Sequence, residues 1–151
     1  MDLRAYQDRD RDTCLRLFDA NAALGHFHPS ERPNYEDFLH HPGAYYVLEH
    51  EGAVLGAGGW AREESESMAS LCWGLIAPDF QRRGLGRLLT MYRLREIGKV
   101  PGVTMVRLDT SQNSVGFYEK QGFRVVAVKK DGYAPGLDRI EMVKRLEVCS
   151  A

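Results

Sequence analysis

The residues with the clearest chemical potential form a glycine-rich turn, Gln-Arg-Arg-Gly-Leu-Gly, at positions 81–86. Gly84 and Gly86 have no Cβ, so they allow the main chain to approach a ligand closely. The residues that follow have helical periodicity, and the start of a helix presents unpaired N–H groups and the positive end of its dipole. A turn of this kind between a strand and a helix suits an anion such as a pyrophosphate.

The spacing of the glycines separates this turn from two other phosphate-binding loops. The pattern G-x-x-x-x-G-K-[ST] is absent, and so is G-x-G-x-x-G. Taken alone, the turn could also be a tight connection in which the glycines serve only geometry. A second motif is needed to decide between the two interpretations.

That second motif is Gly-Phe-Tyr-Glu-Lys-Gln-Gly-Phe at positions 116–123. Taken alone, Tyr118 is better explained as an amphipathic core tyrosine beside Phe117. With both motifs and the order of the elements, however, the chain resembles the GNAT superfamily of N-acetyltransferases. The turn is similar to that family's Q/R-x-x-G-x-G/A signature, and the second segment is similar to its F-Y-x-K-x-G-F segment.

The resemblance implies that acetyl-coenzyme A is the acetyl donor. It implies that the backbones of Leu75 and Ile76, on a strand that splays from its neighbour, contact the pantetheine arm. Ser111 stands where the family usually has an asparagine, seven residues before the motif tyrosine, and is the positional candidate for a side-chain contact. The residues expected at the pyrophosphate are Arg82, Arg83, Gly84, Leu85, Gly86 and Arg87.

Acetyl transfer to an amine requires a deprotonated nucleophile, donors for the oxyanion, and an acid that protonates the departing thiolate. Tyr118 resembles the family's acid, since a phenol keeps its proton at neutral pH. We expect the neighbouring Phe117 to point elsewhere, into the core. The backbone N–H of Ile76 is the expected oxyanion donor, freed where the strand bulges or splays.

The sequence names no general base. The stretch 68–74 has no acidic residue, and Glu63, Glu64 and Glu66 precede it as turn residues. Deprotonation of the amine through water therefore stays open. The histidine pairs 26/28 and 40/41 lack carboxylates at the spacing of known metal sites, so the sequence predicts loop histidines and no metal.

Hydrophobic periodicity and turn signals predict the elements that position these residues. We expect an α+β, GNAT-like fold, with a mixed, mostly antiparallel central sheet of about six to seven strands flanked by about four helices. A single acetyltransferase domain should occupy residues 1–151. Strands are expected at 3–6, 44–49, 54–61, 68–76, 103–109, 124–128 and 139–146, and helices after Asp10, at 35–39, at 86–98 and at 114–121.

Composition places the chain among ordinary globular proteins, with 44% hydrophobic and 27% charged residues. The first residues lack the apolar stretch of a secretory signal, and the three cysteines are widely spaced. These features predict a cytoplasmic protein that does not contact a membrane. The sequence leaves a homodimer open.

The charge is divided between the two halves. Residues 1–80 hold 6 Lys and Arg against 14 Asp and Glu, whereas residues 81–151 hold 14 against 7. The acidic half predicts an acceptor, small molecule or peptide, whose amine is cationic. The basic stretch 81–99 is typical either of a surface for a polyanion or of a solvated helix face.

Two other functions compete with catalysis. One is a non-catalytic acyl-coenzyme A-binding sensor or regulatory module; Tyr118 argues against it and the missing base argues for it. The other is a nucleic-acid-binding domain, but the chain lacks a recognition motif and its isoelectric point is about 6.5. We therefore expect no nucleic-acid partner.

Overall fold

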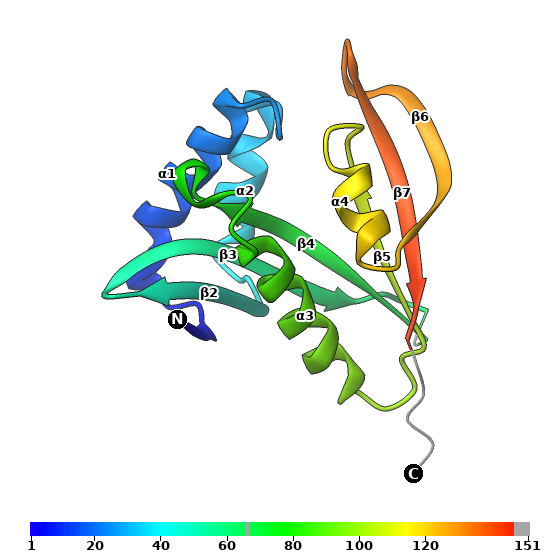
Figure 1. The fold of residues 1–151 in the computed structure, drawn as a ribbon, viewed down its shortest axis with the longest axis horizontal. Coiled ribbons are helices and arrows are strands. Elements are labelled where there is room, and N and C mark those ends of the chain that lie inside the picture. Colours follow the sequence, from blue (N-terminus) through cyan, green and yellow to red (C-terminus); the bar gives the residue numbers. More distant parts are fainter. Residues whose placement is uncertain (66, 147–151) are drawn as a thin grey trace.

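A seven-stranded sheet forms the centre of the protein in the computed structural model, which describes residues 1–65 and 67–146. The strand order is β1-β2-β3-β4-β5-β7-β6, and all neighbours are antiparallel except β4 and β5 (Figure 1). The strands are β1 (Asp2–Ala5), β2 (Ala44–His50), β3 (Ala53–Arg62), β4 (Met68–Ile76), β5 (Met105–Thr110), β6 (Arg124–Ala134) and β7 (Leu137–Arg145).

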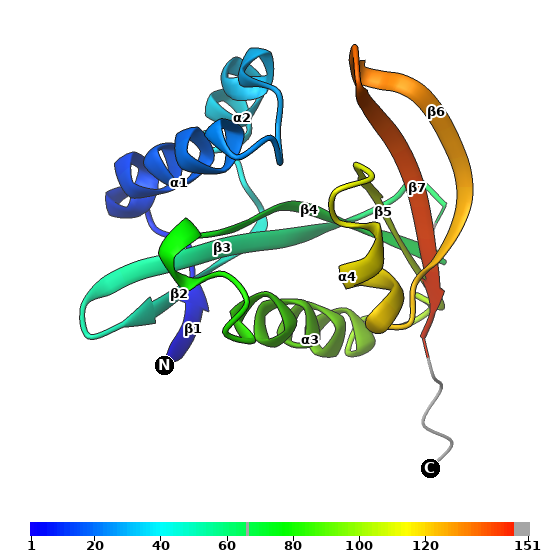
Figure 2. The same cartoon turned by 45° about the horizontal axis from the view of Figure 1, so that its top comes forward.

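Four α-helices cover the two faces of this sheet. Figure 2 shows α1 and α2 on one face and α3 and α4 on the other. The helices are α1 (Arg11–Ala23), α2 (Arg32–Phe38), α3 (Leu85–Gly98) and α4 (Val115–Lys120). The expected α+β fold, a mixed and mostly antiparallel sheet flanked by helices, is therefore confirmed.

The parallel pair β4 and β5 separates soon after it forms. Only three residue pairs join the two strands, from Met68 opposite Met105 to Ser70 opposite Arg107. Beyond Ser70, β4 continues to Ile76 on β3 alone, while β5 continues on β7. The two strands thus open a wedge in the middle of the sheet.

Different side chains fill the two faces. The face under α1 and α2 has an aromatic cluster, in which Phe18, Tyr35 and Tyr45 are fully buried and Trp73 packs against them. The face under α3 and α4 is mostly aliphatic, with Phe123 among its buried residues. Burying large rings on one face fixes α1 and α2 to the sheet at the edge of the wedge.

Two boundaries differ from the predictions by three residues or more. Helix α2 begins at Arg32 instead of residue 35, because Pro33 lies in the first turn, where a missing N–H costs nothing. Strand β6 runs on to Ala134, and the turn is reduced to Pro135 and Gly136. The register shift between Lys129 and Ala134 absorbs the residues that we expected to form a loop.

Candidate functional site

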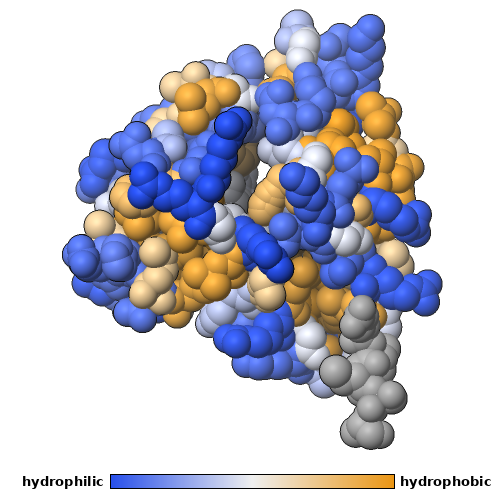
Figure 3. Space-filling model, viewed as in Figure 1, coloured by the Kyte–Doolittle hydropathy of each residue, from blue (hydrophilic) through white to orange (hydrophobic). Residues whose placement is uncertain are grey.

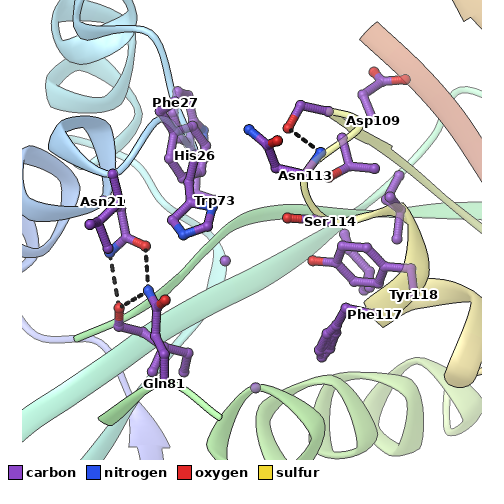
Figure 4. A pocket seen from close by; sticks show the side chains of 18 of the residues that line it. Asn21, His26, Phe27, Trp73, Gln81, Asp109, Asn113, Ser114, Phe117 and Tyr118 are labelled. Atoms are coloured by element: carbon purple, nitrogen blue, oxygen red, sulfur yellow. Dashed lines mark hydrogen bonds between the residues drawn. The ribbon is translucent and has the colours of Figure 1, made fainter. Parts of the chain in front are cut away.

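The wedge between β4 and β5 is an open cleft of about 850 Å³. Figure 3 shows the molecule hollowed between the half that carries α1 and α2 and the half that carries α4, β6 and β7. In Figure 4, His26, Phe27 and Trp73 form one wall, and Phe117 and Tyr118 form the other. Residues from both halves of the sequence therefore meet in one cavity.

The start of α3 lies at the mouth of this cleft. Gly84 has φ +82° as the residue before the helix, and Arg82 also has a positive φ, +63°. The first hydrogen bond of the helix joins the Leu88 N–H to the Gly84 carbonyl at 3.0 Å, and no side chain caps the helix. The N–H groups of residues 85–87 are thus open to an anion.

Most of the residues expected at the cofactor line the cleft, namely Ile76, Arg82, Gly84, Gly86, Arg87 and Ser111. Leu85 is buried in the core instead, beside Leu48 and Leu55, although its N–H still belongs to the open first turn. Arg83 lies over the ring of Phe80, 5.3 Å from its centroid. Its side chain therefore does not line the cleft.

Leu75 does not offer its backbone to the cleft. It lies opposite Ala57 in the ladder, while the Ala77 N–H donates to the Leu55 carbonyl at 2.8 Å. Because hydrogen-bonded and non-hydrogen-bonded pairs alternate in an antiparallel ladder, the polar groups of Leu75 face β3 and those of Ile76 face the wedge. Within the predicted pair, only Ile76 has backbone groups that reach the site.

The Ile76 carbonyl is already occupied. It accepts hydrogen bonds from Asn21 Nδ2 at 3.0 Å and from Gln81 Nε2 at 3.2 Å, and Gln81 also donates to Asn21 Oδ1 (Figure 4). A carbonyl oxygen has two lone pairs, so the N–H of Ile76 is the group left for a ligand. The same two side chains tie α1 and the glycine turn to the end of β4.

We expect Asn21→Leu to lower the free energy of unfolding by about 1–3 kcal/mol, because it leaves buried polar groups of Ile76 and Leu17 with fewer partners. Urea denaturation measures this. The matched control is Asn113→Leu, in which the lost amide is exposed, and which should change stability by less than about 0.5 kcal/mol. Equal losses in the two variants would contradict a special role for Asn21.

Tyr118 and Phe117, both on α4, line the wall of the cleft opposite Trp73, and their side chains point in different directions (Figure 4). Figure 4 shows the Tyr118 hydroxyl pointing into the cleft, while its ring packs on the core and contacts Phe123, 5.8 Å between centroids. The prediction that Phe117 points into the core is wrong. Its ring lies over α3, where a Cβ built on Gly86 would come within 3.3 Å of it. Gly86 is therefore needed for the packing of α4 on α3, in addition to any approach by a ligand.

Ser111 is buried at the edge of the cleft, and its Oγ accepts a hydrogen bond from the Asn113 N–H at 3.3 Å. Asn113 in turn donates its side-chain amide to the Gly25 carbonyl across the cleft at 3.2 Å. Ser111 thus places a small hydroxyl where the family usually has an asparagine, and Asn113, two residues further on, bridges the two walls of the cleft.

The sequence did not single out Glu31, which lines the cleft on the α1–α2 side. It is half-buried, and desolvation raises the pKa of its carboxyl group despite the opposing effects of Arg139 and His28. Tyr133 also lines the cleft, and desolvation raises its pKa to about 12. No ion pair of Glu31 occurs within the part of the chain that the structure describes. A three-residue helical turn directly before α2 gives no periodic signal, so the sequence could not place this carboxylate.

Other candidates have structural roles or lie apart. Glu63 accepts a hydrogen bond from Arg107 at 3.1 Å, Glu64 is exposed, and Glu66 lies outside the described residues. Burial raises the pKa of the Cys72 thiol to about 11, as expected for a strand residue that is not a nucleophile. Among residues 1–65 and 67–146, no group of three His, Cys, Asp or Glu side chains is placed to hold a metal ion.

The splayed sheet and its cleft define the fold of the GNAT acetyltransferases. The chain belongs to that family, since the family model for the acetyltransferase (GNAT) domain matches residues 19–146. Membership implies acyl transfer that depends on an acyl-coenzyme A. A comparison with curated proteins gives no match.

Solved structures agree over nearly the whole chain. The ribosomal-protein-S18-alanine N-acetyltransferase from Escherichia coli is 18% identical over 99% of this chain and 96% of its own, with a TM-score of 0.80. Ard1 from Thermoplasma volcanium is 20% identical over 97% and 98%, with a TM-score of 0.81. An aminoglycoside 6'-N-acetyltransferase complexed with coenzyme A is 14% identical over 100% of both chains, with a TM-score of 0.78. At such identities the likeness shows the fold alone.

No helix in the described part of the chain is long and apolar enough to cross a membrane.

Proposed function

We propose that the chain transfers an acetyl group from acetyl-coenzyme A to a primary amine of a small molecule or peptide, by direct attack of the amine on the thioester. The observation that carries the proposal is the cleft itself. It has the open N–H groups of α3 at its mouth and the hydroxyl of Tyr118 on its wall. A helix N-terminus favours a pyrophosphate, and a phenol can supply the proton that a thiolate needs.

The roles follow from position. The first turn of α3, with Arg82 and Arg87 beside it, would hold the pyrophosphate. The N–H of Ile76, with its carbonyl occupied, would donate to the thioester oxygen, and Ser111 is placed to contact the pantetheine arm. Tyr118 would then protonate the sulfur.

The acceptor would enter from the α1–α2 side. Glu31 lies there without an ion pair among the described residues, and a half-buried carboxylate attracts a cationic amine more strongly than an exposed one does. Glu31 is therefore a specific residue of the acidic half, residues 1–80, that could attract the amine inside the cleft. An amine that has lost its proton, to Glu31 or to water, could then attack the thioester.

We expect Glu31→Gln to raise the KM for a cationic amine and to leave the affinity for acetyl-coenzyme A unchanged. In the parent enzyme, kcat/KM for the amine should fall on the acid side at a pH above the ordinary range of a glutamate, because desolvation raises this pKa. The Glu31→Gln variant should not show this acid-side fall in kcat/KM. Glu64→Gln, at an exposed turn, is the matched control. A parent-like pH profile in the Glu31 variant would contradict the assignment.

The proposed activity is tested by incubating the protein with acetyl-coenzyme A and a panel of amines, and by measuring free thiol. Release that depends on one amine, with the acetylated amine found by mass spectrometry, is the expected result. Tight coenzyme binding with no release for any amine would favour the non-catalytic acyl-coenzyme A-binding module instead.

A further inference from the structure

Arg93 is a buried charge in the middle of α3. Its side chain is 2% exposed, and no carboxylate lies within ion-pair distance of it among the residues that the structure describes. Its Nε makes no hydrogen bond. A buried guanidinium without a counter-ion is costly, so its surroundings should show what it is kept for.

Those surroundings are a slot made by glycines. A Cβ built on Gly58 of β3 would come within 3.2 Å of the guanidinium carbon, and one built on Gly74 of β4 would come within 3.3 Å of Nη2. The slot lies where β4 bulges opposite Gly58, between the pairs Ala57–Leu75 and Gly59–Cys72. Both Arg93 and Gly74 line the cleft. The glycines thus let the guanidinium reach the floor of the wedge.

One edge of the guanidinium has unused hydrogen-bonding capacity, since its buried Nε has no partner among the described residues. Nη1 donates to the Gly59 carbonyl at 3.2 Å. Nη2 lies 3.5 Å from Thr90 Oγ1, at the limit of a hydrogen bond, and that hydroxyl gives its own proton to the Gly86 carbonyl at 2.8 Å. The edge formed by Nε and Nη2 is one that binds anions in arginine side chains.

The position of Arg93 along α3 indicates which part of the coenzyme it would contact. Arg93 lies seven residues after Gly86, which is about 10 Å along a helix. The proposed pyrophosphate site is at the start of that helix, so Arg93 would face the part of the coenzyme that lies deeper in the cleft, toward its sulfur.

We propose that Arg93 is a catalytic residue, whose guanidinium stabilises the thiolate of coenzyme A as it departs. This inference rests on the proposed function. The amine nitrogen forms a bond to the thioester carbon, and the C–S bond breaks with its electron pair going to sulfur. The extra proton of the amine goes to water. The thiolate is held by Arg93 until it takes the proton of Tyr118, which regains one from water.

The proposal is tested on the complex with coenzyme A, without turnover. The ultraviolet absorbance of the thiolate, taken as the difference between the complexes with coenzyme A and with desulfo-coenzyme A, gives the pKa of the bound thiol. An opposite charge within about 4–6 Å lowers a pKa by about 1–3. We expect a fall of that size relative to free coenzyme A, so that coenzyme A binds more tightly as the pH rises.

Three variants locate the effect. Arg93→Met should return the thiol pKa to the value in free coenzyme A, and Arg93→Lys should keep part of the fall. The matched control Arg95→Met, on the exposed side of the same helix, should keep all of it. Arg93→Lys serves if the methionine variant does not fold.

The difference in absorbance between the coenzyme A and desulfo-coenzyme A complexes also separates the coenzyme thiol from other titratable groups in the cleft. Cys72, with a pKa of about 11, stays a thiol below about pH 9, and the desulfo complex subtracts its signal. Tyr118→Phe should keep the fall in thiol pKa. The remaining titratable side chains that line the cleft are His26, His28, Glu31, Arg82, Arg87, Asp109, Lys120 and Tyr133.

A bound coenzyme A with an ordinary thiol pKa overturns the role of Arg93 and leaves the proposed function standing. A protein that does not bind coenzyme A overturns both. If the parent protein binds succinyl-coenzyme A at least tenfold more tightly than acetyl-coenzyme A, and Arg93→Met removes the preference, then Arg93 holds an acyl carboxylate and the thiolate role is wrong.

Discussion

Replacing Tyr118 by phenylalanine should lower kcat by about 10²–10⁴-fold, the usual contribution of general acid catalysis, when departure of the thiolate limits the rate. The substitution keeps the ring, which packs on the core and on Phe123, and removes only the hydroxyl that points into the cleft (Figure 4). Since no hydrogen bond of that hydroxyl joins it to another described residue, its loss should leave the melting temperature nearly unchanged. Affinity for acetyl-coenzyme A should also remain.

Single-turnover kinetics with a validated amine, beside a thermal melt, separate these effects. The control is Tyr92→Phe on α3, which removes a phenol outside the cleft. If Arg93 stabilises the thiolate, the double change Tyr118→Phe and Arg93→Met should cost more than the two single changes multiplied together, because each group partly covers the loss of the other. A Tyr118 variant with full single-turnover chemistry would reduce this residue to a packing role.

The elements of the fold could be predicted because their side chains repeat. Alternation in strands and helical spacing on α1 and α3 are local properties, and the turn residues bound them. The wedge was expected only from the family resemblance, since nothing in residues 68–76 shows that pairing with β5 stops at Ser70. The splay arises because β4 loses β5 as a hydrogen-bonded neighbour after Ser70 and keeps only β3. Such pairing depends on the arrangement of the whole sheet and not on the local sequence.

The candidate site could likewise be predicted only where its residues belong to a local motif. The glycine turn and Tyr118 are motif residues, whereas Asn21 acts through Gln81, sixty positions away, and no pattern links them.

Arg93 shows a different failure. We interpreted the basic stretch 81–99 as a surface patch or a solvated helix face, but Arg93 is buried and Arg83 and Arg95 lie over aromatic rings. A signal was present, because Leu89, Arg93 and Ile97 are spaced by four residues and so share one side of the helix.

Gly84 provides the second large effect. The position has φ +82°, and a Cβ built on it meets no atom within 4 Å. A Cβ there would therefore project into the mouth of the cleft without touching the described residues. Its cost to folding would come from the backbone, since the left-handed conformation costs a residue with a Cβ about 1–2 kcal/mol. That cost must be separated from an effect on the coenzyme.

Gly52 makes the separation possible, because it has φ +81° in the β2–β3 turn, has equally open space, and lies outside the cleft. Gly84→Val and Gly52→Val should lose similar amounts of stability. Only Gly84→Val should lose affinity for acetyl-coenzyme A, by at least about tenfold, since a displaced pyrophosphate forfeits charged hydrogen bonds worth about 1.5–3 kcal/mol each. Calorimetric titration of both folded variants measures this. Because backbone strain is matched, parent-like affinity in Gly84→Val would mean that the glycine turn only connects β4 to α3, and that the coenzyme is held elsewhere.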